Sequence, residues 1–202
     1  MDRKETFTLT SSSQEPNPDE PFLPPIENPE DPKMKQTYES MRQQFGKVFT
    51  PLKVLSARLP YAFYEFTAKI NELDNQLTIP RETSTLIREQ VARINVCMFC
   101  MDASRLAAIN FAEISEAKID ALPQYRSSPL FTDAERAALD YATELTREKK
   151  VRPETFARLS RYYSERQICE IVYVIASEHL YNIGNIGLNI HSDMLCKIPQ
   201  AH

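Results

Sequence analysis

The stretch VARINVCMFC, residues 91–100, places Cys97 and Cys100 three positions apart in a chain of 202 residues that has only four cysteines. If the segment is helical, the two side chains lie on one face with Cβ atoms about 5 to 6 Å apart, which a disulfide can close with small adjustment. Asn95 is a good N-cap residue, and a helix starting there would place Cys97 at its second position, where the helix dipole lowers a thiol pKa. The pair can therefore switch between dithiol and disulfide.

Two other interpretations of the pair stay open on spacing alone. Cysteine is often buried as a small apolar residue, so the two could simply belong to the core. A zinc site would need two further ligands, and no second close pair exists among the remaining candidates, Cys169, Cys196, His179, His191 and His202. No metal or other cofactor is expected, and Cys169, in the apolar segment QICEIVYV, is expected in the core.

The residues around this stretch predict an all-α fold. Only three glycines occur, too few for the tight turns of an all-β protein, whereas good helix formers are plentiful. The first expected helix begins at Pro32 after Asp31, and the second follows Thr50-Pro51 and is interrupted at residues 78–80. The next begins at Arg81, leads into the cysteines and continues to Phe111. Further helices are expected from Ser115, from Thr132 with a capping box to Glu135, over residues 153–163, and from Ser164 or Glu165 to about Asn182.

Residues 1–33 differ from the rest, which we treat as one helical domain over residues 34–202. The segment holds seven prolines and carries a net charge of -5, whereas the remainder is near +1. Such a segment cannot form a regular helix or its own core, so it is expected to be an acidic, proline-rich arm. It is either a flexible leader or an arm laid across a neighbouring subunit, with Phe22 and Leu23 as anchors.

The charge and hydropathy patterns exclude two classes of partner. No basic stripe of the kind that nucleic-acid binders show is present. No apolar run reaches the length of a membrane span, and the start MDRKETFTLTSSS lacks the apolar region of a signal peptide. The expected location is the cytoplasm, where a close cysteine pair is more often catalytic or metal-binding than structural.

Residues 51–198 resemble the carboxymuconolactone decarboxylase-like superfamily, in particular its branch similar to alkyl hydroperoxide reductase D (AhpD-like). The likeness is carried by VARINVCMFC, by TDAERAALDYATELT at residues 132–146, and by the segment that begins VRPETFARLS at residue 151. It implies an all-helical bundle that associates as a trimer or a dimer of trimers. It also implies a peroxide-reducing cycle in which Cys100 attacks the peroxide, Cys97 resolves the sulfenic acid as a disulfide, and an unidentified thiol re-reduces the pair.

The resemblance weakens at the proton relay of the family. The positions that hold a glutamate and a histidine in its active peroxidases are Thr85 and Ser104 here, and neither can act as a base near neutral pH. Glu89 and His179 are the candidates to stand in, and His179 is the better one, because the family packs its last helix against the cysteine-bearing helix. Asn182 and Tyr181 are expected in the same pocket.

Three functions follow as alternatives. The leading one is a thiol oxidoreductase that reduces peroxides, with an activity weakened by the missing relay. The second is the lactone decarboxylase activity that gives the superfamily its name, which needs no dithiol. The third is a non-catalytic helical oligomer that binds a small ligand or a protein partner.

Overall fold

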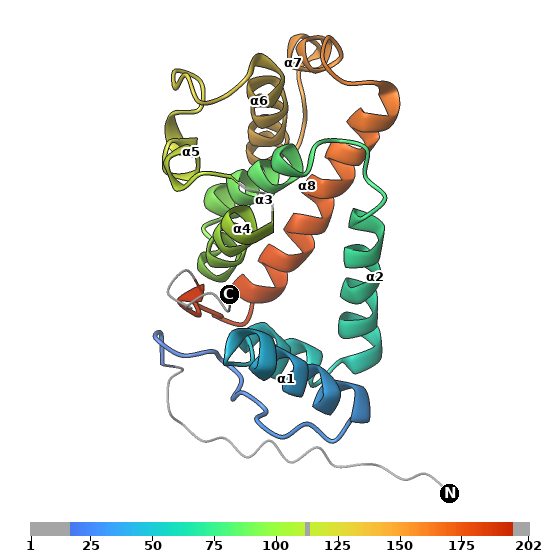
Figure 1. The fold of residues 1–202 in the computed structure, drawn as a ribbon, viewed down its shortest axis with the longest axis vertical. Coiled ribbons are helices and arrows are strands. Elements are labelled where there is room, and N and C mark those ends of the chain that lie inside the picture. Colours follow the sequence, from blue (N-terminus) through green and yellow to red (C-terminus); the bar gives the residue numbers. More distant parts are fainter. Residues whose placement is uncertain (1–16, 112–113, 196–202) are drawn as a thin grey trace, which may run out of the picture.

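The computed structural model describes residues 17–111 and 114–195, and within these ranges the regular structure is helical throughout, with no strand (Figure 1). The all-α prediction is therefore confirmed for the described residues. The elements in chain order are α1 (Pro32–Phe45), η1 (Leu52–Ser56), η2 (Pro60–Tyr64), α2 (Glu65–Asp74), α3 (Arg81–Asn95), α4 (Met98–Phe111), α5 (Glu116–Asp120), η3 (Leu122–Gln124), α6 (Asp133–Glu148), α7 (Pro153–Leu159) and α8 (Glu165–Ile186).

Local capping fixes where several helices start. The Asp31 carboxylate accepts a hydrogen bond from the Met34 N–H at the start of α1. Thr132 and Glu135 form a reciprocal capping box at the start of α6, and Ser164 forms another with Gln167 at the start of α8. Each cap satisfies N–H groups that have no partner inside the helix. These three predicted starts are confirmed, although α8 runs four residues beyond the predicted Asn182.

Two predicted helices are shorter or more broken than expected. The segment after Pro51 was expected to form one helix, but it forms the π-helical turns η1 and η2 before α2 begins. Pro60 explains the break, because it lacks an N–H and disfavours a helical conformation at Leu59, whose φ is -127° and ψ 59°. The helix expected over residues 153–163 ends at Leu159.

The core is built around α3, which packs against α4, α6 and α8 (Figure 1). Its amphipathic pattern places one apolar stripe toward α6 and α8, where Ile87 and Val91 meet Ala138, Ile171 and Ile175. Full burial of each aliphatic side chain of this kind contributes about 1.5 to 3 kcal/mol. This packing sets α3, α4 and α8 rigidly around the cysteine pair.

The described part of the arm, residues 17–31, lies against its own chain. The N–H of Phe22 donates to the Leu188 carbonyl at 3.0 Å, and the Asn189 amide donates to the carbonyls of Pro18 and Glu20, both at 2.8 Å. The side chains of Phe22 and Leu23 are exposed on this chain. The first sixteen residues of the predicted arm lie outside the described residues.

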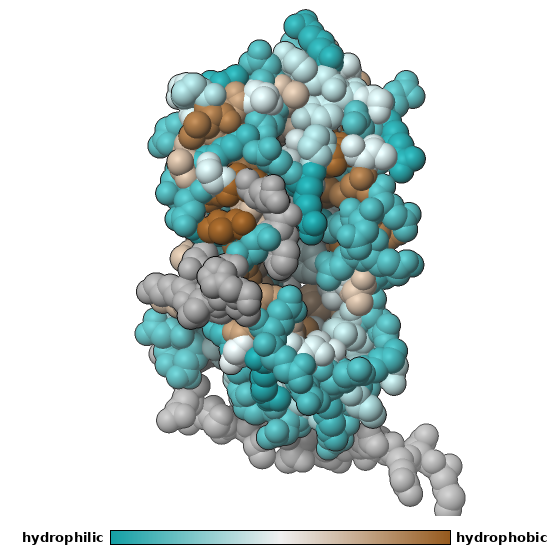
Figure 2. All heavy atoms as spheres, viewed as in Figure 1, coloured by the Kyte–Doolittle hydropathy of each residue, from teal (hydrophilic) through white to brown (hydrophobic). Residues whose placement is uncertain are grey.

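The surface is mixed rather than broadly apolar. On the face shown in Figure 2, hydrophilic residues predominate and apolar residues form separate small patches. Among the described residues, no helix is both long enough and apolar enough to cross a membrane.

Candidate functional site

The junction between α3 and α4 places the cysteines. Val96 adopts the left-handed conformation (φ 58°, ψ 36°), and the Cys97 N–H donates back to the Ala92 carbonyl at 2.9 Å. The Cys97 carbonyl then accepts from the Met101 N–H at 3.0 Å, so Cys97 precedes the first turn of α4 and Cys100 lies within that turn. The orphan N–H groups and the dipole of α4 therefore favour a thiolate at Cys100.

The expected N-cap at Asn95 is a wrong prediction. Asn95 is the last residue of α3, and its side chain turns toward α8, where the amide nitrogen lies 2.7 Å from Asn182 Oδ1 and 3.2 Å from His179 Nδ1. The amide is held by these tertiary partners, so the new helix begins two residues later than expected.

Cys97 and Cys100 are joined by a disulfide with their Cα atoms 5.3 Å apart. They are 1% and 4% exposed and belong to an apolar cluster formed with Val54, Ala92, Phe99, Leu106, Ile190 and Leu195. The buried amide of Asn185 on α8 points at the pair, with Nδ2 3.3 Å from Cys100 Sγ and 4.0 Å from Cys97 Sγ. A donor in this position would stabilise the Cys100 thiolate more than that of Cys97.

A cavity of about 350 Å³ opens beside Cys100 but does not reach Cys97. Most of its wall is apolar and aromatic, contributed by α2, α4, α8 and the segment before α2. The lining residues are Phe49, Pro51, Leu52, Ser56, Phe63, Thr67, Asn71, Asp74, Arg88, Phe99, Cys100, Ala103, Ser104, Ala107, Glu178, Tyr181 and Asn185. Of the two sulfurs, only Cys100 is therefore accessible to a molecule in the cavity.

Three charged side chains form the polar part of this cavity. The Arg88 guanidinium pairs with Asp74 at 2.8 Å, and its other terminal nitrogen lies 3.2 Å from Ser177 Oγ and 3.4 Å from Glu178 Oε2. The second carboxylate oxygen of Glu178 accepts from the Asn182 amide at 2.6 Å. Glu178 is 4% exposed, and burial raises its pKa from 4.5 to about 7 against the lowering effect of Arg88 and Asn182.

Ser104 lines the Cys100 cavity one helical turn beyond Cys100. Thr85 lines a neighbouring polar cavity of about 640 Å³, whose wall also includes Arg88 and Ser104. The Thr85 hydroxyl donates to the Arg81 carbonyl at 2.9 Å. The two relay positions thus face adjoining spaces, but neither supplies a titratable group.

The expected stand-in bases do not line the Cys100 cavity. The ring of His179 is half-buried beside Asn95. Its pKa is lowered mainly by burial and secondly by the positive charge of the nearby Lys149. Glu89 is buried and bonded to Arg93 at 2.7 Å through one oxygen, and the second oxygen has no hydrogen-bond partner among the described residues. Burial raises the Glu89 pKa to about 7.

Of the other two residues expected in this pocket, Tyr181 lines it, whereas Asn182 lies behind Glu178 and is fully buried. Cys169 is exposed, so its expected place in the core is wrong. It lies one position past the buried Ile168, a rotation of about 100° around the helix.

Sequence reasoning missed Glu178, Arg88 and Asn185 as site residues. Glu178 and Asn185 lie seven positions apart on α8, two full turns, so they share the face that meets α4. Polar residues that recur at this spacing within the buried face of a largely apolar helix were the available signal.

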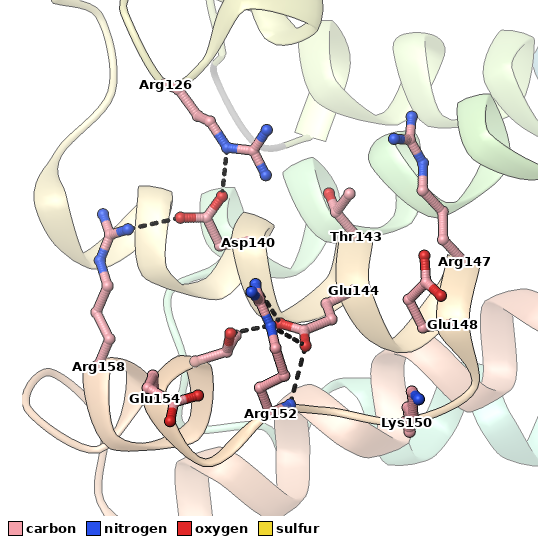
Figure 3. Close-up of a pocket in the computed structure, with 11 residues that line it drawn as sticks. Arg126, Asp140, Thr143, Glu144, Arg147, Glu148, Lys150, Arg152, Glu154 and Arg158 are labelled. Atoms are coloured by element: carbon pink, nitrogen blue, oxygen red, sulfur yellow. Dashed lines mark hydrogen bonds and ion pairs between the residues drawn. The ribbon is translucent and has the colours of Figure 1, made fainter.

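A larger cavity lies elsewhere, a polar cleft of about 770 Å³ along α6 and α7 (Figure 3). Several of its charges are paired: Asp140 lies between Arg126 at 2.7 Å and Arg158 at 2.6 Å, and Glu144 pairs with Arg152 at 2.8 Å. It contains no cysteine. Across residues 17–111 and 114–195, no group of three or more His, Cys, Asp or Glu side chains is placed to hold a metal ion. The cavity beside Cys100 is therefore the candidate site.

Comparison with known proteins places the chain by its fold. No protein-family model matches the sequence. The uncharacterized protein YnjA of Escherichia coli is 27% identical over 165 residues, which span 79% of this chain and 87% of YnjA. The crystal structure of the debrominase Bmp8 superimposes with a TM-score of 0.72 at 24% identity, over 85% of this chain and 91% of Bmp8.

An Agrobacterium tumefaciens protein, described as a putative AhpD of antioxidant defence, superimposes with a TM-score of 0.62 at 24% identity. The match covers 69% of this chain and 96% of that protein. The fold that the resemblance of residues 51–198 implies is thereby confirmed: the described residues have the helical fold of these AhpD-like and Bmp8 structures.

Proposed function

We propose that the protein is a thiol oxidoreductase in which Cys100 reacts with the substrate and Cys97 resolves the product as a disulfide. The observation that carries this proposal is the disulfide-bonded pair itself, with a cavity that reaches Cys100 and stops short of Cys97. The Asn185 amide and the first turn of α4 add donors on the Cys100 side.

With a peroxide as substrate, the chemistry balances without a cofactor. The Cys100 thiolate attacks one peroxide oxygen, the O–O bond breaks, and the products are a Cys100 sulfenic acid and an alkoxide that takes up a proton. The Cys97 thiol then displaces hydroxide from the Cys100 sulfur, and the disulfide forms with release of water. An external thiol, of the kind that the expected cytoplasmic location supplies, returns the pair to the dithiol.

Two features favour an organic substrate and a modest rate. The cavity is lined by three phenylalanine rings and is far larger than a hydrogen peroxide molecule needs, so an organic hydroperoxide fits it better. Thr85 and Ser104 provide no acid or base, and loss of such a group typically costs about 10² to 10⁴-fold in rate. The similarity to a protein of antioxidant defence supports peroxide as the substrate class.

A second candidate function is reductive dehalogenation of an aromatic compound. The same aromatic cavity and the fold shared with a debrominase favour it, since a Bmp8 variant with one cysteine replaced by alanine binds 2,3,4-tribromopyrrole. The dithiol would supply two electrons, so that an aryl halide gives the arene, a halide ion, a proton and the Cys97–Cys100 disulfide. The lactone decarboxylase and the non-catalytic binding protein remain the alternatives in which the dithiol does not cycle.

The deciding experiment uses a background in which the other two cysteines, Cys169 and Cys196, are replaced by serine. The reduced protein is treated with cumene hydroperoxide and a dimedone-type reagent, and the labelled residue is located by mass spectrometry. Cys97→Ser should be labelled on Cys100, whereas Cys100→Ser should show no label. Label on Cys97 in the Cys100→Ser protein would reverse the two roles.

The same experiment distinguishes the chemical alternatives. Absence of label and of disulfide formation in every variant would exclude peroxide reduction. A brominated phenol that oxidises the reduced pair and releases one bromide per disulfide would then support dehalogenation. If neither reagent oxidises the pair, the non-redox alternatives gain.

We also propose that the protein is a homo-oligomer, as a trimer or a dimer of trimers. An exposed stripe of weakly polar and apolar residues runs along α8 at helical spacing, formed by Cys169, Val172, Ala176, Ile183 and Ile186. Contiguous apolar surface of this kind is typical of subunit interfaces. Sedimentation of the purified protein at micromolar concentration tests this proposal, and a monomer would contradict it.

A further inference from the structure

We infer that the Cys100 cavity selects an uncharged organic molecule whose head group donates a hydrogen bond to Glu178 while its reducible end lies at Cys100. This inference rests on the proposed function, because it names the substrate class of the same site. It follows from the length of the cavity, the chemistry of its wall and the balance of donors and acceptors at its polar end.

The distance between the two ends of the cavity follows from the positions of two residues on α8. Asn185 marks the reactive end, since its amide contacts Cys100 Sγ at 3.3 Å. Glu178 lies seven residues earlier on the same face, and at 1.5 Å per residue the two positions are about 10 Å apart along the helix axis. After one hydrogen bond of about 3 Å at the head group, a molecule with the span of a para-substituted benzene ring bridges the remaining distance.

Most of the rest of the wall is apolar. The rings of Phe49, Phe63 and Phe99 lie on it, together with the small side chains Ala103 and Ala107. Rings of Phe49 and Phe99 already meet edge to face with centroids 6.1 Å apart. Such a wall favours an aromatic or branched aliphatic body, which gains from burial and from ring contacts.

The carboxylates at the polar end have acceptor capacity left. The Arg88 guanidinium donates to Asp74, Ser177 and Glu178. Each Glu178 carboxylate oxygen has two lone pairs, and the structure uses one on each, through Asn182 at 2.6 Å and Arg88 at 3.4 Å. The capacity that Glu178 has left for a ligand is therefore acceptance of a hydrogen bond, which a hydroxyl or an N–H group satisfies.

The charges at this end disfavour an anionic head group. Asp74 and Glu178 outnumber Arg88 when both are ionised, and the cluster is neutral when Glu178 carries a proton. Glu89, on the neighbouring α3, adds a further negative influence on Glu178. A carboxylate brought into this enclosed space would meet uncompensated negative charge, which costs more at low dielectric than in water. Fatty-acid-like substrates are thereby disfavoured relative to neutral alcohols, phenols or N–H compounds.

The test measures binding to the disulfide form, so no redox turnover is involved. The probes are benzyl alcohol, 4-hydroxybenzyl alcohol and 4-(hydroxymethyl)benzoate, which differ only in the para group, and calorimetry or ligand-observed NMR near pH 8 gives the affinities. We expect 4-hydroxybenzyl alcohol to bind about 10-fold tighter than benzyl alcohol, because its phenol is a stronger hydrogen-bond donor to a charged acceptor than an alcohol hydroxyl is. The benzoate should bind at least about 10-fold more weakly than benzyl alcohol.

Glu178→Gln keeps an acceptor for Asn182 but removes the charge. In this variant the benzoate should gain about 10-fold, and the advantage of 4-hydroxybenzyl alcohol should shrink to about 2- or 3-fold. Glu165→Gln, the same substitution at an exposed position in the first turn of α8, should change nothing. Equal affinities of the three probes, binding of none, or an unchanged order in Glu178→Gln would each overturn the inference. Failure of the proposed function is seen separately, as a reduced pair that peroxide does not oxidise.

Discussion

Replacing Glu178 with glutamine should change how the stability of the protein depends on pH. Glu178 has a pKa of about 7 in the folded protein and 4.5 as its ordinary value, because burial opposes ionisation. The folded state therefore binds this proton more tightly than the unfolded state does. The contribution of Glu178 to stability is highest below about pH 4.5, falls as the pH rises, and levels off above about pH 7. A glutamine side chain does not titrate, so the variant should lack this component of the fall.

The magnitude follows from the shift in pKa. Each unit corresponds to about 1.4 kcal/mol, and between roughly pH 5 and pH 8 the difference between the two proteins should grow by about 2 to 3 kcal/mol. For a chain of this length, that amounts to about 5 to 10 °C in Tm. The variant should be the more stable protein near pH 8, even though it has lost a charged hydrogen-bond acceptor for Asn182.

Urea unfolding of the disulfide form, followed by circular dichroism at several pH values and at one fixed protein concentration, measures this difference. Glu165→Gln is the matched control, because it removes an exposed carboxylate from the same helix. The reasoning is refuted if the stability difference between wild type and Glu178→Gln is the same near pH 5 and pH 8. A difference that grows in the opposite direction would show that pairing with Arg88 outweighs burial.

Three further predictions concern the junction, the thiolate and the surface of α8. Asn185→Leu removes the donor 3.3 Å from the Cys100 sulfur, so it should raise the thiol pKa of Cys100 by about one unit or more and slow alkylation by iodoacetamide near neutral pH by about 10-fold. An unchanged pH profile of alkylation would count against the contact between Asn185 and Cys100. Val96→Gly should stabilise the protein by about 1 kcal/mol in denaturant titrations, because Val96 is 68% exposed and its left-handed conformation costs a β-branched residue about 1 to 2 kcal/mol. The control Val172→Gly, inside a helix, should destabilise the protein instead. Ile183→Glu should weaken the proposed subunit association by about 100-fold or more in sedimentation velocity, and an unchanged oligomer would exclude the α8 stripe as its interface.

What the sequence predicts well here is local. Asp31 with Pro32, the capping box at Thr132 and Glu135, and the cap at Ser164 each start a helix because their hydrogen bonds need only residues within one turn. Asn95 has the same local signature but lies at the end of a helix, because its amide finds partners on α8, more than eighty residues later in the chain. A capping motif in the sequence cannot show that such distant side chains compete for the Asn95 amide.

The local sequence does not decide which titratable residue of α8 lines the site. His179 is the more obvious base, yet a rotation of about 100° separates it from Glu178, and it is Glu178 that lines the cavity with Cys100. The position of Arg88, ninety residues earlier, gives that carboxylate its partner. Helix register relative to the neighbouring helices, which comes from packing, decides which polar residue meets the reactive sulfur.

The segment after α8, which binds the arm, also determines when the cysteine pair can be enclosed during synthesis. Residues 17–31 are synthesised well before their partners, which include Leu188, Asn189 and His191, about 170 residues later in the chain. Ile190 and Leu195, which pack in the cluster around the cysteine pair, belong to the same late segment. The apolar enclosure of Cys97 and Cys100 is therefore completed only after translation has passed this segment, and until then both thiols are open to oxidants and to other cysteines.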